Sequence, residues 1–365
     1  MKYFAEITDL TVVRAFFAAW VFAYHVDLHA HFSGSLGPFA GFIRHGYLGV
    51  DGFFMLSGLI LAAVHSAAEL KGANIARFWG KRLARIYPVH LAVMLILLVI
   101  VATGLALGFT PRDADRFTGG SFIANLLLVQ GWGVGEHLAW NYPSWSVSTE
   151  WAGYLMFPLL WMFLGTWREI IPGQIMVISF AVLGMIAYEA GETLNLTYAN
   201  ALWRFFPEFI IGMATLRLVP LNADFMPNKW LAYISLAAIV LLTSASSFDI
   251  LVVFALWVLL AALAMQADAE RPPVIRNPRI LRFLGQISYS FYMSFGTIEL
   301  LLAQLFRHQG WDPASHRLAY GAAMTILTLA LAIALHRLVE TPARRLADRW
   351  LAVPQPPLAV AGQPL

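Results

Sequence analysis

The sequence predicts an all-α fold: a polytopic transmembrane helix bundle of about ten spans, with both termini in the cytoplasm. Of its 365 residues, 59% are hydrophobic and only 12% are charged, and the mean hydropathy is +0.68. A soluble domain needs more charged residues than this to cover its exterior. Apolar stretches of nearly twenty residues also recur along the chain, each long enough to cross about 30 Å of hydrocarbon. These observations indicate one membrane domain over residues 1–351 rather than several globular domains.

Each expected span is a long apolar stretch of the sequence. The apolar stretch at 122–130 is too short to cross the membrane, so we expect an interfacial or re-entrant segment on the outer side. Residues 352–365 are rich in proline and are expected to form a disordered tail. The ten spans are predicted at 10–27, 47–65, 87–109, 148–166, 172–190, 203–218, 229–246, 249–267, 284–304 and 317–338.

The distribution of basic residues tests this topology, because cytoplasmic loops carry an excess of Lys and Arg. With both termini inside, 17 of the 24 basic residues fall in inner segments, six fall in outer segments, and Arg14 lies within the first span. The basic clusters flank apolar stretches, which favours membrane lipids over nucleic acid as partners. The chain has no cysteine, which excludes thiolate metal ligands and a cysteine nucleophile, and we expect no metal.

Ionisable residues inside the spans are the first candidates for function, because each costs about 3 kcal/mol to place at the bilayer centre. Arg14 and His25 are eleven residues apart, which places them on one face of the first helix, about 16 Å apart. Asp51 and Glu150 begin the second and fourth spans, at the depth expected for His25. Two carboxylates beside an imidazole would orient its tautomer, as a general base requires. A structural polar cluster is an equally open interpretation.

The inner side carries positive charge where the third span begins, in the segment Lys81, Arg82 and Arg85. Arg82 and Arg85 are three residues apart and share a helix face. Two explanations are open for this segment. It either reflects only the usual excess of basic residues on the cytoplasmic side of a membrane protein, or it forms an anion site for phosphate groups, for which the arginine fork is well suited. Arg14, predicted at the same level, favours the anion site.

Several hydroxyl residues within the spans allow other interpretations. Serine in a transmembrane helix usually bonds a backbone carbonyl or a neighbouring helix, so we expect structural roles for Ser57, Ser146, Ser148 and Ser288. Tyr289 is predicted either to contact a ligand or to pack in the core.

The final span is followed by Glu340, Thr341 and Pro342. We expect Glu340 to end this helix and to pair with Arg344 or another arginine on the inner side.

Six segments spread along the chain form an ordered set of motifs. They are RAFFAAWVFAYH at 14–25, GVDGFFMLSG at 49–58, KRLARIYP at 81–88, PSWSVSTEW at 143–151, LGQISYSFYMSF at 284–295 and VETPARR at 339–345. In this order they resemble the segments of the membrane acyltransferase-3 family, whose bacterial members modify surface polysaccharides, peptidoglycan, lipid-linked sugars and some antibiotics. The resemblance covers nearly the whole chain.

The resemblance implies an O-acyltransferase of the bacterial inner membrane that takes an acyl group, usually acetyl, from acyl-CoA at the cytoplasmic face. It implies that His25 is the essential catalytic residue and that Arg14, Arg82 and Arg85 act on the donor side. The acceptor would be a hydroxyl of a sugar or lipid-linked glycan.

One departure and one alternative qualify this prediction. Many family members carry a Trp-His pair where this chain has Ser294 and Phe295, and the sequence does not assign Glu299, one turn further on, to replace that histidine.

A proton-coupled transporter or flippase of a glycan-related solute would also explain buried acidic residues and a basic inner side. Such a protein would need a continuous path and no thioester.

Overall fold

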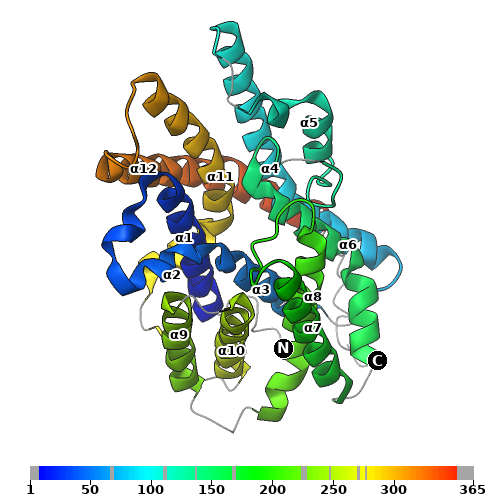
Figure 1. Cartoon of the computed structure of the whole chain (residues 1–365). Coiled ribbons are helices and arrows are strands. Elements are labelled where there is room, and N and C mark those ends of the chain that lie inside the picture. The colour runs from blue at the N-terminus through cyan, green and yellow to red at the C-terminus, as the bar shows by residue number, and fades with distance from the viewer. Residues whose placement is uncertain are drawn as a thin grey trace.

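The computed structural model describes residues 8–65, 70–109, 113–135, 138–166, 170–222, 228–245, 248–268, 272–275 and 278–351. Every regular element within these residues is helical (Figure 1). The predicted tail at 352–365 lies outside the described residues. The helices are α1 (Thr8–Ala30), α2 (Ala40–Arg44), α3 (Gly49–Val64), α4 (Ala73–Ala106), α5 (Gly119–Leu126), α6 (Trp145–Thr166), α7 (Ile170–Glu189), α8 (Ala201–Asn222), α9 (Asn228–Ser244), α10 (Asp249–Asp268), α11 (Arg279–His308), α12 (Arg317–Leu335) and α13 (Thr341–Trp350).

The ten predicted spans each coincide with a long helix, which confirms the all-α prediction. By length and composition, six helices in the described part of the chain are apolar enough to cross a membrane. They are α1, α3 with its preceding turn, α4, α7, α10 and the continuous segment from α12 to α13. The count of ten spans and the cytoplasmic position of the termini stay predictions. The stretch at 122–130 contributes only the end of the eight-residue helix α5, which is too short to cross the bilayer.

The start of α4 corrects the prediction that Lys81, Arg82 and Arg85 lie where the third helix begins. The helix starts at Ala73 and continues through Pro88, so the three cations lie about two turns or more inside it. Proline lacks a backbone N–H and usually marks a helix boundary, but the polar segment before it remains helical and packs against α13. The cations are therefore held on a continuous helix rather than on a loop.

The end of the last predicted span also differs from the prediction. A π-helical turn at His336–Glu340 links α12 to α13, so the chain stays helical to Trp350. Glu340 does not end the helix, but its predicted pairing with Arg344 is confirmed by a contact of 3.7 Å. The Glu340 carboxylate also accepts a hydrogen bond of 2.7 Å from Ser290 Oγ, which ties α11 to the final helical segment.

Glycines allow the helices that carry the polar residues to approach closely. A Cβ atom at Gly58 of α3 would lie 2.0 Å from the Phe209 carbonyl oxygen, and one at Gly212 of α8 would lie 1.9 Å from the Met55 oxygen. Gly285 of α11 is equally close to the backbone of α1 at Thr11. Small residues at such crossings are typical of membrane helix packing. They fix the depth and rotation of α3 against α8 and of α11 against α1, which lie side by side in Figure 1.

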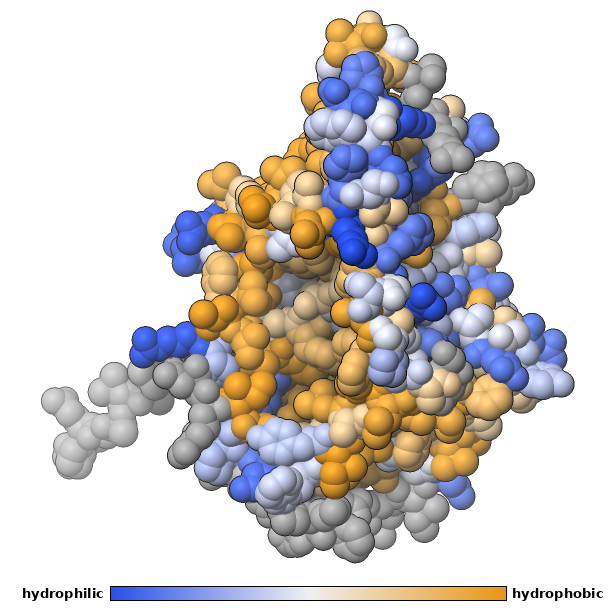
Figure 2. Space-filling model, turned by 60° about the vertical axis from the view of Figure 1, so that its left-hand side comes forward, coloured by the Kyte–Doolittle hydropathy of each residue, from blue (hydrophilic) through white to orange (hydrophobic). Residues whose placement is uncertain are grey.

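The exterior is largely apolar, as a lipid-facing surface requires. Figure 2 shows a hollow bordered on its left and below by hydrophobic residues, with a band of hydrophilic residues running from the top of the molecule down its right-hand side. A soluble monomer rarely exposes apolar patches of this extent. Among the exposed large apolar side chains are Leu95, Leu98 and Val99 on α4, Val177, Ile178 and Met185 on α7, and Leu318, Ile326 and Leu327 on α12.

Candidate active site

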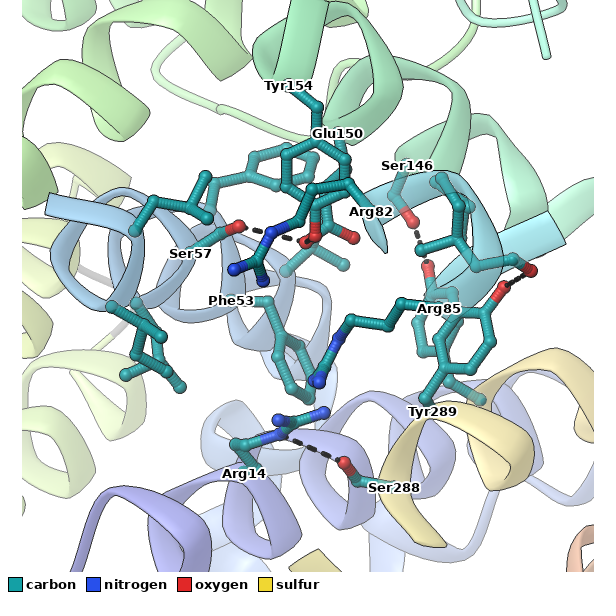
Figure 3. A pocket seen from close by; sticks show the side chains of 18 of the residues that line it. Arg14, Phe53, Ser57, Arg82, Arg85, Ser146, Glu150, Tyr154, Ser288 and Tyr289 are labelled. Carbon is teal, nitrogen blue, oxygen red and sulfur yellow. Dashed lines mark hydrogen bonds between the residues drawn. The ribbon is translucent and has the colours of Figure 1, made fainter. Parts of the chain in front are cut away.

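Three arginines from two helices line one cavity, which we call the arginine cavity. It has a volume of about 180 Å³ and contains Arg14 of α1, Arg82 and Arg85 of α4, and Tyr289 of α11. Figure 3 shows the guanidinium groups of Arg14 and Arg85 pointing toward one another, with Arg82 on the opposite wall. The four residues that the sequence predicted for ligand binding therefore line the same cavity.

The positive charge in this cavity is not neutralised by direct ion pairs. In the described part of the chain, none of the three arginines has a carboxylate oxygen within 4.0 Å. Arg14 Nε donates to Ser288 Oγ at 3.3 Å, and Arg82 Nη2 lies 3.0 Å from His65 Nε2. Among the residues that the structure describes, Arg82 Nε is buried without a hydrogen-bond partner. Three such cations around one cavity favour the binding of an anion, most of all one with several oxygens.

Glu150 lies in the arginine cavity rather than beside His25, so its predicted placement is wrong. Its Oε1 accepts hydrogen bonds from Ser57 Oγ at 2.8 Å and from Tyr154 OH at 2.5 Å. The helix that carries it begins at Trp145 instead of the predicted 148. Glu150 is therefore about one turn deeper in the bundle than the sequence indicated.

The predicted serines are held by hydrogen bonds within the bundle, as expected for structural residues. Ser288 forms a hydrogen bond with Arg14, and Ser57 forms one with Glu150. Ser148 Oγ donates to the Leu128 carbonyl at 2.7 Å. Tyr289 OH donates to the Ile86 carbonyl at 2.5 Å, so it links α11 to α4 at the cavity wall.

His25 faces a second and larger cavity of about 700 Å³, which we call the His25 pocket. Its Nδ1 lies 2.9 Å from the hydroxyl of Tyr142 and 3.8 Å from Oε2 of Glu299. The Tyr142 hydroxyl donates to the same Glu299 oxygen at 2.5 Å. On the other side, His29 Nε2 lies 2.8 Å from Glu299 Oε1. One carboxylate thus organises two histidines and a tyrosine.

This network selects one tautomer of His25. The Tyr142 hydroxyl has a single proton, and it is donated to Glu299. Its oxygen therefore accepts a hydrogen bond from Nδ1–H of His25, which leaves Nε2 unprotonated. Within the described residues, Nε2 has no hydrogen-bond partner, and the side chain is 16% exposed to the pocket. An imidazole held in this form is ready to accept a proton.

Sequence reasoning missed three members of this network. It left Glu299 unassigned and considered neither His29 of α1 nor Tyr142, which lies in the short turn before α6. The sequence does contain a signal for Glu299, because it is a carboxylate within the predicted span 284–304 and such residues need a partner or a function. Tyr142 carries no comparable signal. Within the described residues, no group of three or more acidic residues, histidines or cysteines is placed to hold a metal ion.

Asp51 pairs with Arg204 rather than with His25, contrary to the prediction. Its carboxylate accepts a hydrogen bond of 3.0 Å from Arg204 Nε and contacts Arg204 Nη2. Glu208 Oε1 lies 3.7 Å from the same Nε, and all three side chains are fully buried. The close crossing of α3 and α8 at Gly58 and Gly212 turns Asp51 toward α8, where its carboxylate pairs with Arg204.

We expect Arg204→Gln to destabilise the fold far more than Asp51→Asn. Loss of the arginine leaves two buried carboxylates unpaired, which costs about 3–5 kcal/mol. Loss of Asp51 leaves Arg204 next to Glu208, so its charge retains a partner. Thermal unfolding of the detergent-solubilised variants measures the difference, with exposed Arg307→Gln as the control. Equal melting temperatures for wild type and Arg204→Gln would contradict the assignment of this cluster to stability.

The two cavities adjoin one another within the bundle. Val50 and Tyr292 line both of them, and the Tyr292 hydroxyl is held by Ser146 Oγ at 3.0 Å. Arg14 and His25 lie on the same helix, one in each cavity. A cation-lined cavity and a histidine with a free ring nitrogen are therefore separated by only a narrow boundary of side chains.

The chain is similar in sequence to known acyltransferases. The model of a family described as an acyltransferase domain matches residues 7–337. The acyltransferase MdmB of Streptomyces mycarofaciens is 29% identical over 400 residues, covering 98% of this chain and 96% of that protein. The putative peptidoglycan O-acetyltransferase YrhL of Bacillus subtilis is 25% identical, covering 61% of this chain and 35% of YrhL. The O-acetyltransferase OatA of Staphylococcus aureus is 24% identical, covering 43% of this chain and 25% of OatA.

The chain thus spans most of MdmB but only about a third of YrhL and a quarter of OatA. No solved structure matches the chain. The match of the family model to residues 7–337, together with the order of the six segments, shows that this protein belongs to the membrane acyltransferase-3 family.

Proposed function

We propose that this protein is an O-acyltransferase of the bacterial inner membrane that moves an acyl group, acetyl in the simplest case, from acyl-CoA to a hydroxyl of a sugar or lipid-linked glycan. The observation that carries the proposal is the contact between the arginine cavity and the His25 pocket, across Val50 and Tyr292. One cavity suits the anionic donor, and the other contains a base for the acceptor.

The donor would bind from the cytoplasmic side. Arg14, Arg82 and Arg85 would hold its phosphate groups, and Tyr289 would form part of the wall. The pantetheine arm would then extend along α1, where Arg14 and His25 are about 16 Å apart. This path brings the thioester to the boundary between the two cavities.

His25 would act as the general base. Its Nε2 takes the proton of the acceptor hydroxyl while the hydroxyl oxygen forms a bond to the thioester carbonyl carbon. The tetrahedral intermediate then collapses, the carbon–sulfur bond breaks, and the leaving thiolate recovers the proton from the imidazolium. Glu299 and Tyr142 keep Nδ1 protonated, so that Nε2 is the free nitrogen at the start of the cycle.

The experiment that tests this function uses purified protein in lipid nanodiscs, with acetyl-CoA and a soluble glycoside acceptor. We expect release of free CoA thiol that depends on the acceptor, together with an acetylated glycoside identified by mass spectrometry. A transporter or flippase would release no thiol, and that result would favour the alternative function.

We expect Arg82→Ala and Arg85→Ala each to raise the KM for acyl-CoA by about tenfold or more, because each removes a hydrogen bond between charged groups. High salt should weaken donor binding in the wild type, since phosphate recognition is screened. The matched control is Arg77→Ala, on the same helix but bonded to Asn74 outside the cavity. An unchanged donor KM in both variants would mean that these arginines do not bind the donor and only orient the helix in the membrane.

A further inference from the structure

Tyr292 of α11 lies at the boundary between the arginine cavity and the His25 pocket. Among the described residues it shares this position with Val50 alone, so its hydroxyl is the side-chain polar group that borders both cavities. The residue is buried in the bundle. The general-base step at His25 does not use this hydroxyl, and nothing so far explains why a polar group stands where the two cavities meet.

The spacing of residues on α1 and α11 places Tyr292 between the donor site and the base. Arg14 Nε donates to Ser288 Oγ at 3.3 Å. Eleven residues later on each helix, Glu299 lies 3.8 Å from His25. Tyr292 is four residues after Ser288 and seven before Glu299, so it shares their face of α11, about 6 Å and about 10 Å from them along the axis. A thioester that extends from the arginines toward His25 therefore passes Tyr292.

One buried phenylalanine lies between the rings of Tyr292 and His25. The ring centroid of Phe295 is 5.4 Å from that of Tyr292 and 4.8 Å from that of His25. Phe295 is 1% exposed, and a close-packed interior holds such a ring in place. The Tyr292 hydroxyl and the catalytic imidazole are therefore fixed relative to one another by a shared packing partner.

The hydroxyl of Tyr292 is arranged to donate to a ligand. Ser146 Oγ donates to the Tyr292 oxygen at 3.0 Å and to the Pro143 carbonyl at 3.2 Å. Within the described residues, the Tyr292 hydroxyl donates its own proton to no acceptor. A hydroxyl that accepts one hydrogen bond becomes a stronger donor in the next. Tyr292 thus presents a polarised O–H at the boundary of the two cavities.

Other hydrogen-bond donors around His25 are already used within the protein. The Tyr142 hydroxyl donates to Glu299. Arg204 donates to a carboxylate and to two backbone carbonyls, and Arg116 Nε donates to a third carbonyl. Among the residues that the structure describes, none of these three donor side chains lines the arginine cavity, from which the thioester comes. Tyr292 is the donor that reaches both sides.

We infer that Tyr292 is a second catalytic residue, whose hydroxyl donates a hydrogen bond to the thioester carbonyl oxygen and stabilises the oxyanion that forms there. The inference rests on the proposed function. When the acceptor oxygen bonds to the carbonyl carbon, the π electrons of the C=O bond move to its oxygen, which becomes negative. Tyr292 keeps its proton and shares it with this oxygen. The electron pair then re-forms the C=O bond, the carbon–sulfur bond breaks, and the thiolate takes the proton held by His25.

Tyr292→Phe tests the inference in the acetyl-CoA and glycoside assay. We expect kcat to fall by about a hundredfold or more, the usual effect of removing one oxyanion donor. The donor KM should not change, because the arginines that hold the donor are untouched. The fold should survive, since Ser146 keeps its hydrogen bond to the Pro143 carbonyl. Tyr188→Phe, which alters an exposed tyrosine of α7, should leave kcat unchanged.

Ser146→Ala is the matched variant, because it breaks the same hydrogen bond as Tyr292→Phe but keeps the phenol. We expect it to retain kcat within about tenfold of wild type, as for the loss of one ordinary hydrogen bond. Equal losses in the two variants would assign the effect to the link between α6 and α11, and the inference would be overturned.

Infrared spectroscopy of bound acetyl-CoA, labelled with ¹³C at the carbonyl and measured without acceptor, gives a readout that does not need catalysis. A hydrogen bond to the carbonyl oxygen lowers the frequency of its stretch. We expect a lower frequency in wild type and Ser146→Ala than in Tyr292→Phe. Replacement of Tyr292 by 3-fluorotyrosine, a stronger donor of nearly the same shape, should lower it further and serves if Tyr292→Phe does not fold. The same frequency in all of these proteins would overturn the inference.

The two assays separate this inference from the proposed function. A wild-type protein that acetylates the glycoside, with an unchanged kcat in Tyr292→Phe, would overturn the role of Tyr292 and leave the proposed function intact. A Tyr292-dependent carbonyl frequency in a protein that acetylates no glycoside would refute the proposed function and support the contact between Tyr292 and the thioester.

Discussion

His25→Ala is expected to abolish acyl transfer while leaving expression and membrane insertion intact. Loss of a general base lowers the rate by about 10²–10⁴-fold. The fold should survive, because the Tyr142 hydroxyl keeps its hydrogen bond to Glu299 when the imidazole is removed. His25→Gln should fail as well, since an amide nitrogen cannot take up the proton. Acceptor-dependent thiol release from acetyl-CoA measures both variants.

The control is His316→Ala, which removes a histidine from the exposed segment that precedes α12. It should retain full activity. If either His25 variant keeps more than about a tenth of wild-type activity, the loss corresponds to less than about 1.4 kcal/mol of barrier. That is too small for the residue that accepts the proton, and the assignment of His25 as the base would be wrong.

Glu299→Gln is expected to lower kcat by about 10–100-fold and to leave the donor KM unchanged. Glu299 is a positioning residue in this proposal, because it acts through Tyr142 on the ring of His25. A displacement of about 1 Å in a reacting group costs about a hundredfold in rate. The donor KM should not move, because Glu299 lies in the His25 pocket and outside the arginine cavity. Steady-state kinetics with varied acetyl-CoA separates the two parameters.

Tyr142→Phe gives an independent test of the same network, because it breaks the link while the carboxylate remains. It should also lower kcat with no change in donor KM, and Glu299→Asp should recover part of the lost rate. Glu192→Gln, an exposed carboxylate on another part of the chain, is the matched control. Wild-type kcat in both Glu299→Gln and Tyr142→Phe would mean that neither side chain orients the catalytic imidazole.

Residue spacing predicted shared helix faces well where both residues are on one helix. Arg14 and His25 were placed on one face from their separation, and each faces one of two adjoining cavities. Arg82 and Arg85 were paired in the same way and share the arginine cavity. Spacing failed for Asp51 and Glu150, whose predicted neighbour was on a different helix.

The sequence by itself determined the all-α architecture, the position of each long helix and the family, because hydropathy and motif order are properties of the chain alone. Tertiary structure decided which side chains meet between helices. The crossing at Gly58 and Gly212 turns Asp51 to Arg204, and the contact of Gly285 with α1 brings Glu299 to the level of His25. Rotation and depth at such crossings depend on how two helix surfaces fit together, and neither surface contains that information alone.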